Sequence, residues 1–437
     1  MPLPRRRFLS LLASAPALTA MSPHAAEPAA MPHVPWSRQA AIYQVNVRQY
    51  SREGTFAAVT AALPRLHDMG VDILWLMPIQ PIGRIERKGS LGSYYSVRDY
   101  TATNPEFGSL DDVRTLVKAA HALGMKVILD WVANHTAFDH PWVREHKDWY
   151  KLDARGEPYP VTFNEGQPNA EHWSDVTALN YDQPALRDAM IAAMAFWVRE
   201  AGFDGFRCDV AGLVPTPFWE RARRELDAIK PMFMLAESDK RELHEGAFDM
   251  TYGWDLAGLF ADIGAGRAGA AQLRDWLRAE PHGYPRSAYR MRFTTNHDFN
   301  SWNGTDAELY GDAYLPLAVL SFTLPGMPLI YGGQEARLGK RLQFFERDPI
   351  DWKTHELQPF YSGLLTLKHT HPALGNGQYG GAATVLDVGN DALFAFTRTL
   401  GKDAVTVVVN VTKTPQALRL GGQERTLAAS SWLVEAT

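Results

Sequence analysis

The chain has 437 residues, enough for one large domain with a small accessory domain, and its 46% hydrophobic and 21% charged residues are ordinary for a globular protein. The net charge of −5 is spread along the chain, and no basic run points to nucleic acid or an anionic membrane as a partner. A single cysteine, Cys208, excludes an internal disulfide.

The first segment of the chain is typical of an export signal. Arg5-Arg6-Arg7 precedes a short apolar run to Ala20, and this run is too short to span a bilayer as a helix. A twin arginine before such a run resembles a Tat signal, with cleavage after Ala20 or Ala26. We therefore expect residues 1–26 to direct export to the periplasm or the extracellular space, and the mature chain not to insert into a membrane. An uncleaved basic tail is the alternative.

Between residues 37 and 371, short apolar runs alternate with amphipathic stretches, which favours parallel strands joined by helices. The apolar runs number eight, which suits a closed (β/α)8 TIM barrel. Ser109 and Asp112 form a capping-box pattern at the start of one of the helices. The expected strands cover residues 41–47, 71–77, 127–130, 205–209, 232–237, 248–252, 292–295 and 328–331.

Two regions depart from this alternation. Residues 136–180 are polar and contain several prolines without a helical period, so we expect a short subdomain inserted after the third strand. Residues 372–437 contain short alternating strands, such as 393–397 and 405–411, which predict a C-terminal antiparallel β-sandwich. The expected fold class is therefore α/β, a barrel that carries an insertion and is followed by a sandwich domain.

Acidic side chains follow four of the expected strands. Asp130, Asp209, Glu237 and Asp298 lie at or just past the ends of strands three, four, five and seven, where barrels of this kind build their active sites. A lone acid at such a place is better interpreted as a structural ion pair or a helix cap. Because clustered buried carboxylates repel one another, four acids on one rim indicate a functional site.

The fourth expected strand, Gly205-Phe206-Arg207-Cys208-Asp209, carries the most information. Side chains alternate along a strand, so Arg207 and Asp209 face the same way, and the arginine is expected to keep Asp209 ionised for nucleophilic attack. Glu237 ends an apolar strand, where a carboxyl group can hold its proton for donation.

These segments resemble the signature motifs of the α-amylase family, and the match covers residues 40 to 370. The resemblance implies a retaining glycosidase that cleaves α-glucosidic bonds by double displacement, with α-1,4-glucans and maltooligosaccharides as the expected substrates. The matching stretches, in the family's order, are Asp130 to His135, Gly205 to Asp209, Leu235 to Ser238, Thr295 to Asp298 and, for the eighth strand, Gly326 to Tyr331.

The resemblance also implies a role for each matching acid. Asp209 would be the nucleophile, Glu237 the general acid and then the general base, and Asp298 a stabiliser of the transition state. Arg207 would support the nucleophile, and Asp130 would shape the site.

Three further residues are implied to bind the sugar on the non-reducing side of the scissile bond. They are His135, His297 and Tyr95, and Tyr94 is the competing choice for the tyrosine.

The chain departs from the family pattern at three places. The lysine and histidine that usually follow the nucleophile are replaced by Gly212 and Leu213, so contacts to the leaving-group sugars must differ. Ala178 stands where calcium-binding members carry an aspartate, although Asn134 remains, so we expect no metal and no required cofactor, with calcium as the alternative. Val210 directly after the nucleophile accompanies action on α-1,6 bonds in related glucosidases.

Other activities remain open from the sequence. A transglycosylase (glucanotransferase) or an α-1,6-active glucosidase would use the same scaffold and the same acids. A catalytically inert family member with a binding role is a third interpretation, although such proteins usually lose one of the three acids and all three are present here. The sequence does not predict the oligomeric state.

Overall fold

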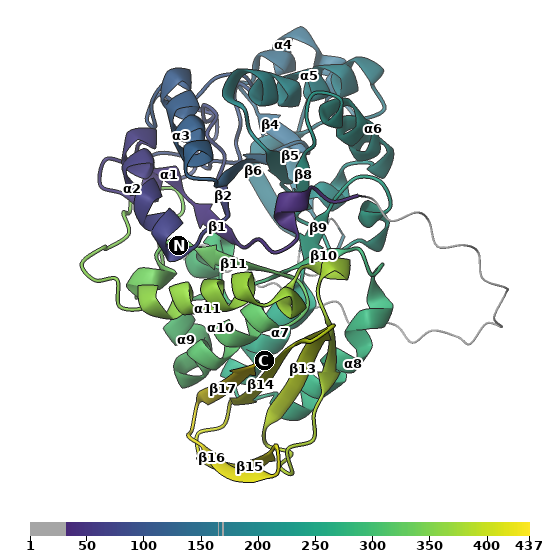
Figure 1. Cartoon of the computed structure of the whole chain (residues 1–437). Helices are drawn as coiled ribbons and strands as arrows, with labels where there is room; N and C mark the ends of the chain where they lie inside the picture. The colour runs from purple at the N-terminus through teal and green to yellow at the C-terminus, as the bar shows by residue number, and fades with distance from the viewer. Residues whose placement is uncertain (1–31, 165, 168–169) are drawn as a thin grey trace, which may run out of the picture.

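Eight parallel strands form a closed barrel in the computed structural model, which describes residues 32–164, 166–167 and 170–437. The strands pair in the order β1-β11-β10-β9-β8-β7-β3-β2, which confirms the predicted barrel (Figure 1). The predicted export signal, residues 1–26, lies outside the described residues. The barrel strands are β1 (Ile42–Val45), β2 (Ile73–Leu76), β3 (Lys126–Trp131), β7 (Gly205–Cys208), β8 (Phe233–Ala236), β9 (Met250–Tyr252), β10 (Tyr289–Arg292) and β11 (Met327–Tyr331).

Helices follow the strands and cover the outside of the barrel (Figure 1). The longer helices are α2 (Phe56–Met69), α3 (Leu110–Ala122), α5 (Pro184–Ala201), α6 (Thr216–Asp227), α7 (Trp254–Gly264), α8 (Ala270–Gly283), α10 (Tyr314–Thr323) and α11 (Gln358–Thr370). The short helical segments are η1 (Pro35–Ser37), α1 (Val47–Tyr50), α4 (Pro141–Glu145), η2 (Lys147–Trp149), η3 (Ala211–Leu213), η4 (Arg241–His244), the π-helix η5 (Phe299–Asn303), α9 (Asp306–Tyr310), η6 (Gly311–Ala313), η7 (Gln334–Ala336), η8 (Pro372–Leu374) and η9 (Gly377–Tyr379).

The predicted capping box begins α3. The Ser109 hydroxyl accepts from the backbone N–H of Asp112 at 3.2 Å, and the Asp112 carboxylate accepts from the backbone N–H of Ser109 at 2.8 Å. Two of the donors left unpaired at the helix start are satisfied in this way, so the helix begins where the sequence indicates.

One strand differs from its prediction. We expected the seventh strand at residues 292–295, but β10 covers Tyr289–Arg292. Arg290 and Arg292 make this segment look polar, yet both are buried, and Arg292 pairs with Glu280 of α8 at 2.7 Å. Paired arginines therefore hid a buried strand from the hydrophobic pattern.

Alternation along the strands separates two cores. On β2, Leu74 and Leu76 pack outward against the helix layer, whereas Ile73 and Trp75 belong to a second cluster inside the barrel. The same alternation on β3 and β7 directs Asp130 and Arg207 inward, near the C-terminal mouth of the barrel. An apolar cluster inside the barrel therefore lies beneath the polar side chains at its C-terminal mouth.

The polar region after the third strand forms a small sheet (Figure 1). Its strands are β4 (His135–Ala137), β5 (Pro160–Phe163) and β6 (Glu171–Ala178), in the order β4-β6-β5. Asp175 of β6 ties this sheet to the loop after β2, because its carboxylate pairs with Lys88 at 2.7 Å and its carbonyl accepts from Ser96 at 2.9 Å. The insertion is thereby fixed beside the barrel mouth.

Antiparallel strands follow the barrel, in line with the predicted C-terminal sandwich (Figure 1). One sheet has the order β12-β13-β14-β17, the other pairs β15 with β16, and Val388, Val408 and Leu418 pack in one apolar cluster there. The strands are β12 (Ala382–Val385), β13 (Phe394–Leu400), β14 (Asp403–Asn410), β15 (Gln416–Leu420), β16 (Gln423–Leu427) and β17 (Ser431–Ala436).

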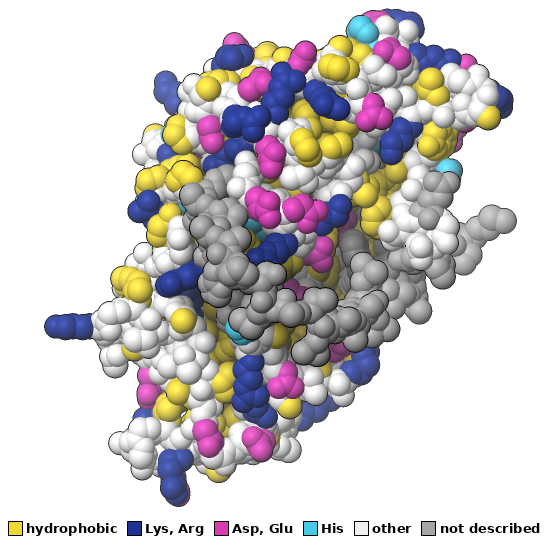
Figure 2. Space-filling view, turned by 90° about the vertical axis from the view of Figure 1, so that its right-hand side faces the viewer, with side chains coloured by type: hydrophobic (Ala, Val, Ile, Leu, Met, Phe, Trp, Pro, Cys, Tyr) yellow, Lys and Arg dark blue, Asp and Glu magenta, His cyan; other side chains and the backbone are white. Residues whose placement is uncertain are grey.

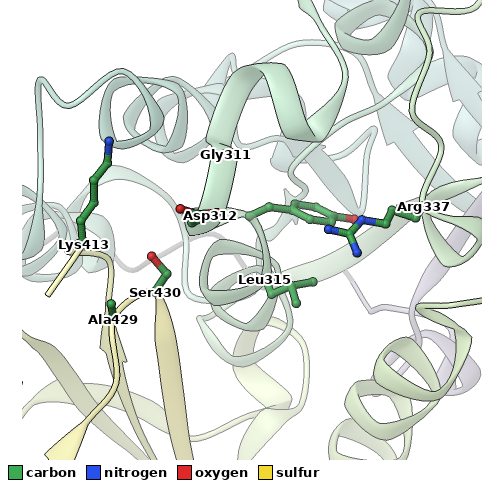
Figure 3. A pocket seen from close by; sticks show the side chains of 8 residues that line it. Gly311, Asp312, Leu315, Arg337, Lys413, Ala429 and Ser430 are labelled. Atoms are coloured by element: carbon green, nitrogen blue, oxygen red, sulfur yellow. The ribbon is translucent and has the colours of Figure 1, made fainter. Parts of the chain in front are cut away.

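Buried basic side chains join this unit to the barrel. Arg398 of β13 donates to the carbonyls of Gly375 and Leu324 at 2.8 and 3.3 Å, and burial lowers its pKa to about 9. Lys368 of α11 donates to Asn376 Oδ1 at 2.8 Å, and burial lowers its pKa as well. A pocket of about 430 Å³ opens at the same junction (Figure 3), lined by residues of both units, including Tyr314, Arg337 and Ser430.

On the face that Figure 2 presents, acidic and basic side chains are interspersed, and no large patch of one charge is seen. Among the described residues, none of the helices combines the length and the apolar character that a membrane span requires.

Candidate active site

The predicted carboxyl side chains converge at the C-terminal mouth of the barrel. Asp130 lies within β3, Asp209 follows β7 directly, and Glu237 follows β8 directly. Asp298 comes six residues after β10, later than predicted, because that strand ends at Arg292. All four residues are buried.

One guanidinium group connects three of these carboxyls. Arg207 Nη1 lies 2.9 Å from Asp130 Oδ1 and 3.1 Å from Asp209 Oδ1, and Nη2 lies 2.9 Å from Glu237 Oε1. Arg207 is fully buried, so water does not screen these contacts. The predicted nucleophile and the predicted acid therefore adjoin the same cation, and a retaining mechanism needs two such carboxyls close together.

Aromatic residues enclose this cation. The Cζ atom of Arg207 lies 5.1 Å from the centroid of the Trp75 ring and 5.6 Å from those of Tyr95 and Tyr252. Arg207 Nε donates to the Tyr252 hydroxyl at 3.1 Å. Ring faces attract a cation and exclude water, so the arginine is held in one orientation.

The electrostatics of the site differ from the sequence prediction. Burial raises the pKa of Asp209 and the neighbouring Glu237 charge raises it further, whereas Arg207 lowers it. The arginine therefore does not keep Asp209 ionised by itself. One ionised and one protonated carboxyl is nevertheless the combination that attack and proton donation need.

Asp130 lies beneath this pair. Burial raises its pKa to about 6 against the opposing effect of Arg207. Its Oδ2 accepts hydrogen bonds from the Trp75 indole and the Tyr95 hydroxyl, both at 3.0 Å. These hydrogen bonds fix the orientation of the Asp130 carboxyl group. This agrees with a role in shaping the site more than with a role in the reaction itself.

A strained residue positions Glu237. Val210 has φ 36° and ψ 43°, the left-handed conformation that β-branched residues rarely adopt. In this conformation its backbone N–H donates to Glu237 Oε2 at 2.8 Å. Strain of this kind is retained where surrounding contacts enforce it, and here it directs a donor to the predicted acid.

The predicted sugar-binding histidines and tyrosine each lie close to one of the carboxyls. His135 Nε2 is 4.0 Å from Asp209 Oδ2, and His297 Nε2 is 3.3 Å from Asp298 Oδ2. Tyr95 contacts both His297 Nε2, at 2.7 Å, and Asp130. Tyr94 instead packs against Arg48, whose Cζ atom lies 4.3 Å from the Tyr94 ring centroid. Of the two tyrosines, Tyr95 is the one brought to the carboxyls.

Three contributors to the site were not predicted from the sequence: Gln44 of β1, Trp75 of β2 and Tyr252 of β9. Gln44 contacts His297 at 2.7 Å, and the other two contact Asp130 and Arg207. A polar glutamine within an apolar strand was the available signal for Gln44. The two aromatic residues look like ordinary core residues in the sequence.

The positions compared with a calcium site have other partners. The Asn134 carbonyl accepts from Leu179 N at 3.0 Å, and its amide nitrogen lies 3.2 Å from His135 Nδ1. Ala178 pairs with His135 in the inserted sheet and offers no side-chain oxygen. In the described part of the chain, no three His, Cys, Asp or Glu side chains come together as a set of metal ligands.

Comparisons with known proteins agree with this geometry. The family model for the α-amylase catalytic domain matches residues 36–246. The crystal structure of an α-amylase from Lactobacillus plantarum is 33% identical, covers 92% of this chain and 99% of that chain, and has a TM-score of 0.82. The maltogenic α-amylase AmyB from Thermotoga neapolitana is 29% identical over 91% of this chain and 96% of that chain, with a TM-score of 0.78.

The curated relatives include longer proteins. α-Amylase MalA of Haloarcula japonica is 29% identical over 88% of this chain, and the match spans 57% of MalA. The identity to the Lactobacillus plantarum enzyme extends over nearly the whole of that chain, and the acids of three matching stretches meet at one arginine. The chain therefore belongs to the α-amylase family of glycoside hydrolases.

Proposed function

We propose that this protein cleaves α-glucosidic bonds with retention of configuration, with α-1,4-glucans and maltooligosaccharides as substrates. The single observation that carries the proposal is the contact of Asp209 and Glu237 with the same guanidinium group of Arg207. That contact keeps two carboxyls side by side, and double displacement requires two carboxyls close together.

The proposed reaction has two steps. Asp209 attacks the anomeric carbon while the Glu237 proton passes to the glycosidic oxygen, so the bond breaks and a glycosyl-enzyme forms. Glu237, now a carboxylate, takes a proton from water, and the water oxygen displaces Asp209 from the sugar. Asp298, His135, His297 and Tyr95 hold the hydroxyl groups of the sugar that stays bound.

A mechanism-based inhibitor tests this proposal directly. A fluorinated α-glucosyl fluoride that forms but does not release the glycosyl-enzyme should leave one sugar on the peptide containing Asp209, as measured by mass spectrometry. The Asp209→Asn variant should remain unlabelled under the same conditions. Labelling of another carboxyl, or none with folded protein, would contradict the assignment of the nucleophile.

Transfer to a second sugar is the competing outcome. Curated relatives include a cyclomaltodextrinase from a Bacillus species, 27% identical, and a maltosyltransferase from Rhodospirillum rubrum, 28% identical. Val210 beside Asp209 is the feature that favours α-1,6 bonds as an alternative. Chromatography of the products from maltotriose, pullulan and isomaltose separates these readings, because hydrolysis yields shorter sugars and transfer yields longer ones.

We further propose that the reaction needs no metal. The donor set supports this, because Ala178 supplies no carboxylate and Asn134 already contacts the inserted sheet. Activity and thermal unfolding should be unchanged by prolonged treatment with a calcium chelator. A loss that added calcium restores would contradict the proposal.

Export is proposed on the sequence alone. The twin arginine at Arg5-Arg6 and the short apolar run after it support a Tat pathway to the periplasm or beyond. Replacing both arginines with lysine should retain the protein in the cytoplasm of a Tat-competent bacterium. Unchanged export in the double variant would contradict a twin-arginine signal.

A further inference from the structure

The side chain of Gln44 is fully buried against His297 at the barrel mouth. An amide in such a place has to satisfy both its carbonyl and its NH2 group, because an unpaired buried polar atom costs free energy. Both ends of Gln44 meet the same residue, one at the backbone and one at the ring.

The backbone contact decides which way the amide points. The His297 N–H can only donate, and it lies 3.3 Å from Gln44 Oε1. The Gln44 NH2 group therefore faces the ring, with Nε2 at 2.7 Å from His297 Nδ1. Because an NH2 group can only donate, Nδ1 has to accept and carries no proton.

The opposite ring nitrogen then holds the proton of the neutral imidazole. His297 Nε2 lies 2.7 Å from the Tyr95 hydroxyl, which donates in turn to Asp130 at 3.0 Å. This gives one directed chain of hydrogen bonds, from Gln44 through His297 and Tyr95 to Asp130. Each member donates in the same direction, so reversing one bond would leave a neighbour unsatisfied.

The charged groups around His297 oppose one another. Asp298 lies 3.3 Å from Nε2 and would favour a cationic ring, as would Asp130 beyond Tyr95. Arg207, with Nη1 3.5 Å from the Tyr95 hydroxyl, disfavours it. The Trp75 and Phe344 rings pack on the imidazole at 5.9 and 6.2 Å and add no charge. The amide is the group that faces the site of the second proton.

We propose that Gln44 is a positioning residue that holds His297 neutral, with its one proton on Nε2 facing the carboxyls. Protonating Nδ1 would require the amide to rotate, which would present its NH2 group to the backbone N–H of His297. The consequence for turnover rests on the proposed function: the imidazole offers sugar a donor of fixed direction and adds no charge to the carboxyl pair.

Nitrogen NMR of the full chain labelled with ¹⁵N-histidine tests the proton position without reference to activity. The chain has 14 histidines, and the His297 signals are identified by their loss in the His297→Gln variant. We expect one protonated nitrogen, Nε2, and one unprotonated nitrogen, Nδ1, from about pH 5 to about pH 8, the range in which an ordinary histidine titrates. A proton on Nδ1 within this range, alone or as a second proton, would overturn the proposal.

Two isosteric variants form a matched pair for the same measurement. Gln44→Glu replaces the NH2 group by an acceptor, so both ring nitrogens of His297 should become protonated. Gln49 is also buried and donates to the carbonyl of Gln343 at 2.8 Å, so Gln49→Glu places the same change at a site that does not touch His297. Gln49→Glu should leave the His297 signals unchanged. An unprotonated Nδ1 in folded Gln44→Glu would overturn the proposal.

Activity provides the second readout. Gln44→Met keeps the side-chain length but removes the donor, and it should lower kcat/KM for an aryl α-glucoside about tenfold, the effect of one misdirected hydrogen bond. An unchanged kcat/KM together with a mixture of ring tautomers would overturn the positioning role. If the wild-type protein cleaves no α-glucoside, the proposed function fails, while the NMR result still decides the state of His297.

Discussion

Removing the shared cation should make stability depend steeply on pH. In Arg207→Met, Asp130, Asp209 and Glu237 lose the positive charge within 3.1 Å that offsets their burial. Breaking a buried ion pair from one side costs about 3–5 kcal/mol. Here that cost depends on whether the carboxyls can respond by taking up protons.

The sign follows from the pKa shifts. The pKa of Asp130 is raised to about 6 and that of Asp209 is also raised, and Arg207 lowers both. A carboxyl whose folded pKa is raised adds stability at low pH that is lost as pH rises from its unfolded pKa of about 4 to its folded pKa. Without Arg207 that window extends upward, so the variant should lose stability across the neutral range.

The free energy of unfolding falls by about 1.4 kcal/mol per pH unit for each carboxyl that stays protonated in the folded state only. Between pH 5.5 and 7.5 one such carboxyl costs about 3 kcal/mol, and for a chain of this size that lowers Tm by about 3 °C. Thermal unfolding followed by circular dichroism at both pH values measures the difference between the variant and the wild type.

A second buried arginine provides the control. Arg292 pairs with Glu280 at 2.7 Å and lies 3.7 Å from Asp255, whose pKa it lowers. Arg292→Met should therefore be destabilised by similar amounts at pH 5.5 and 7.5. Equal losses for Arg207→Met at the two pH values would refute the protonation argument.

Three other outcomes follow from the site. Asp209→Asn should lower kcat/KM by about 10⁴-fold or more with an unchanged Tm, since nothing else can form the glycosyl-enzyme. Glu237→Gln should lose activity on maltotriose but keep much more of it on a glucosyl fluoride, whose leaving group needs no proton, and equal losses would contradict the acid role. Val210→Gly relieves the left-handed strain and keeps the N–H, so Tm should stay the same or rise, which differential scanning calorimetry would measure.

The sequence predicted those features that strand geometry determines. Alternation placed Arg207 beside Asp209, and the observed distance is 3.1 Å. The barrel followed from eight apolar runs, although the arginines of β10 displaced one strand by three residues.

Other features depend on contacts between distant strands. That one guanidinium serves three carboxyls depends on the closure of β3, β7 and β8 around it, which no local pattern encodes. Tyr94 and Tyr95 are neighbours in an irregular loop, so no periodicity could tell which one faces the carboxyls. Trp75 and Tyr252 look like core residues because most of their surface is apolar.

The junction between barrel and sandwich has a consequence for how the chain can be divided. Asn376, beyond the last barrel helix, donates to the carbonyls of Ser37 and Ala40, beside the first barrel strand. Arg398 likewise donates to the carbonyls of Thr323 and Leu324 at the end of α10. Cutting near residue 371 would expose these groups at both ends of the barrel chain. The pattern of elements changes there, but the two parts should melt as one cooperative unit.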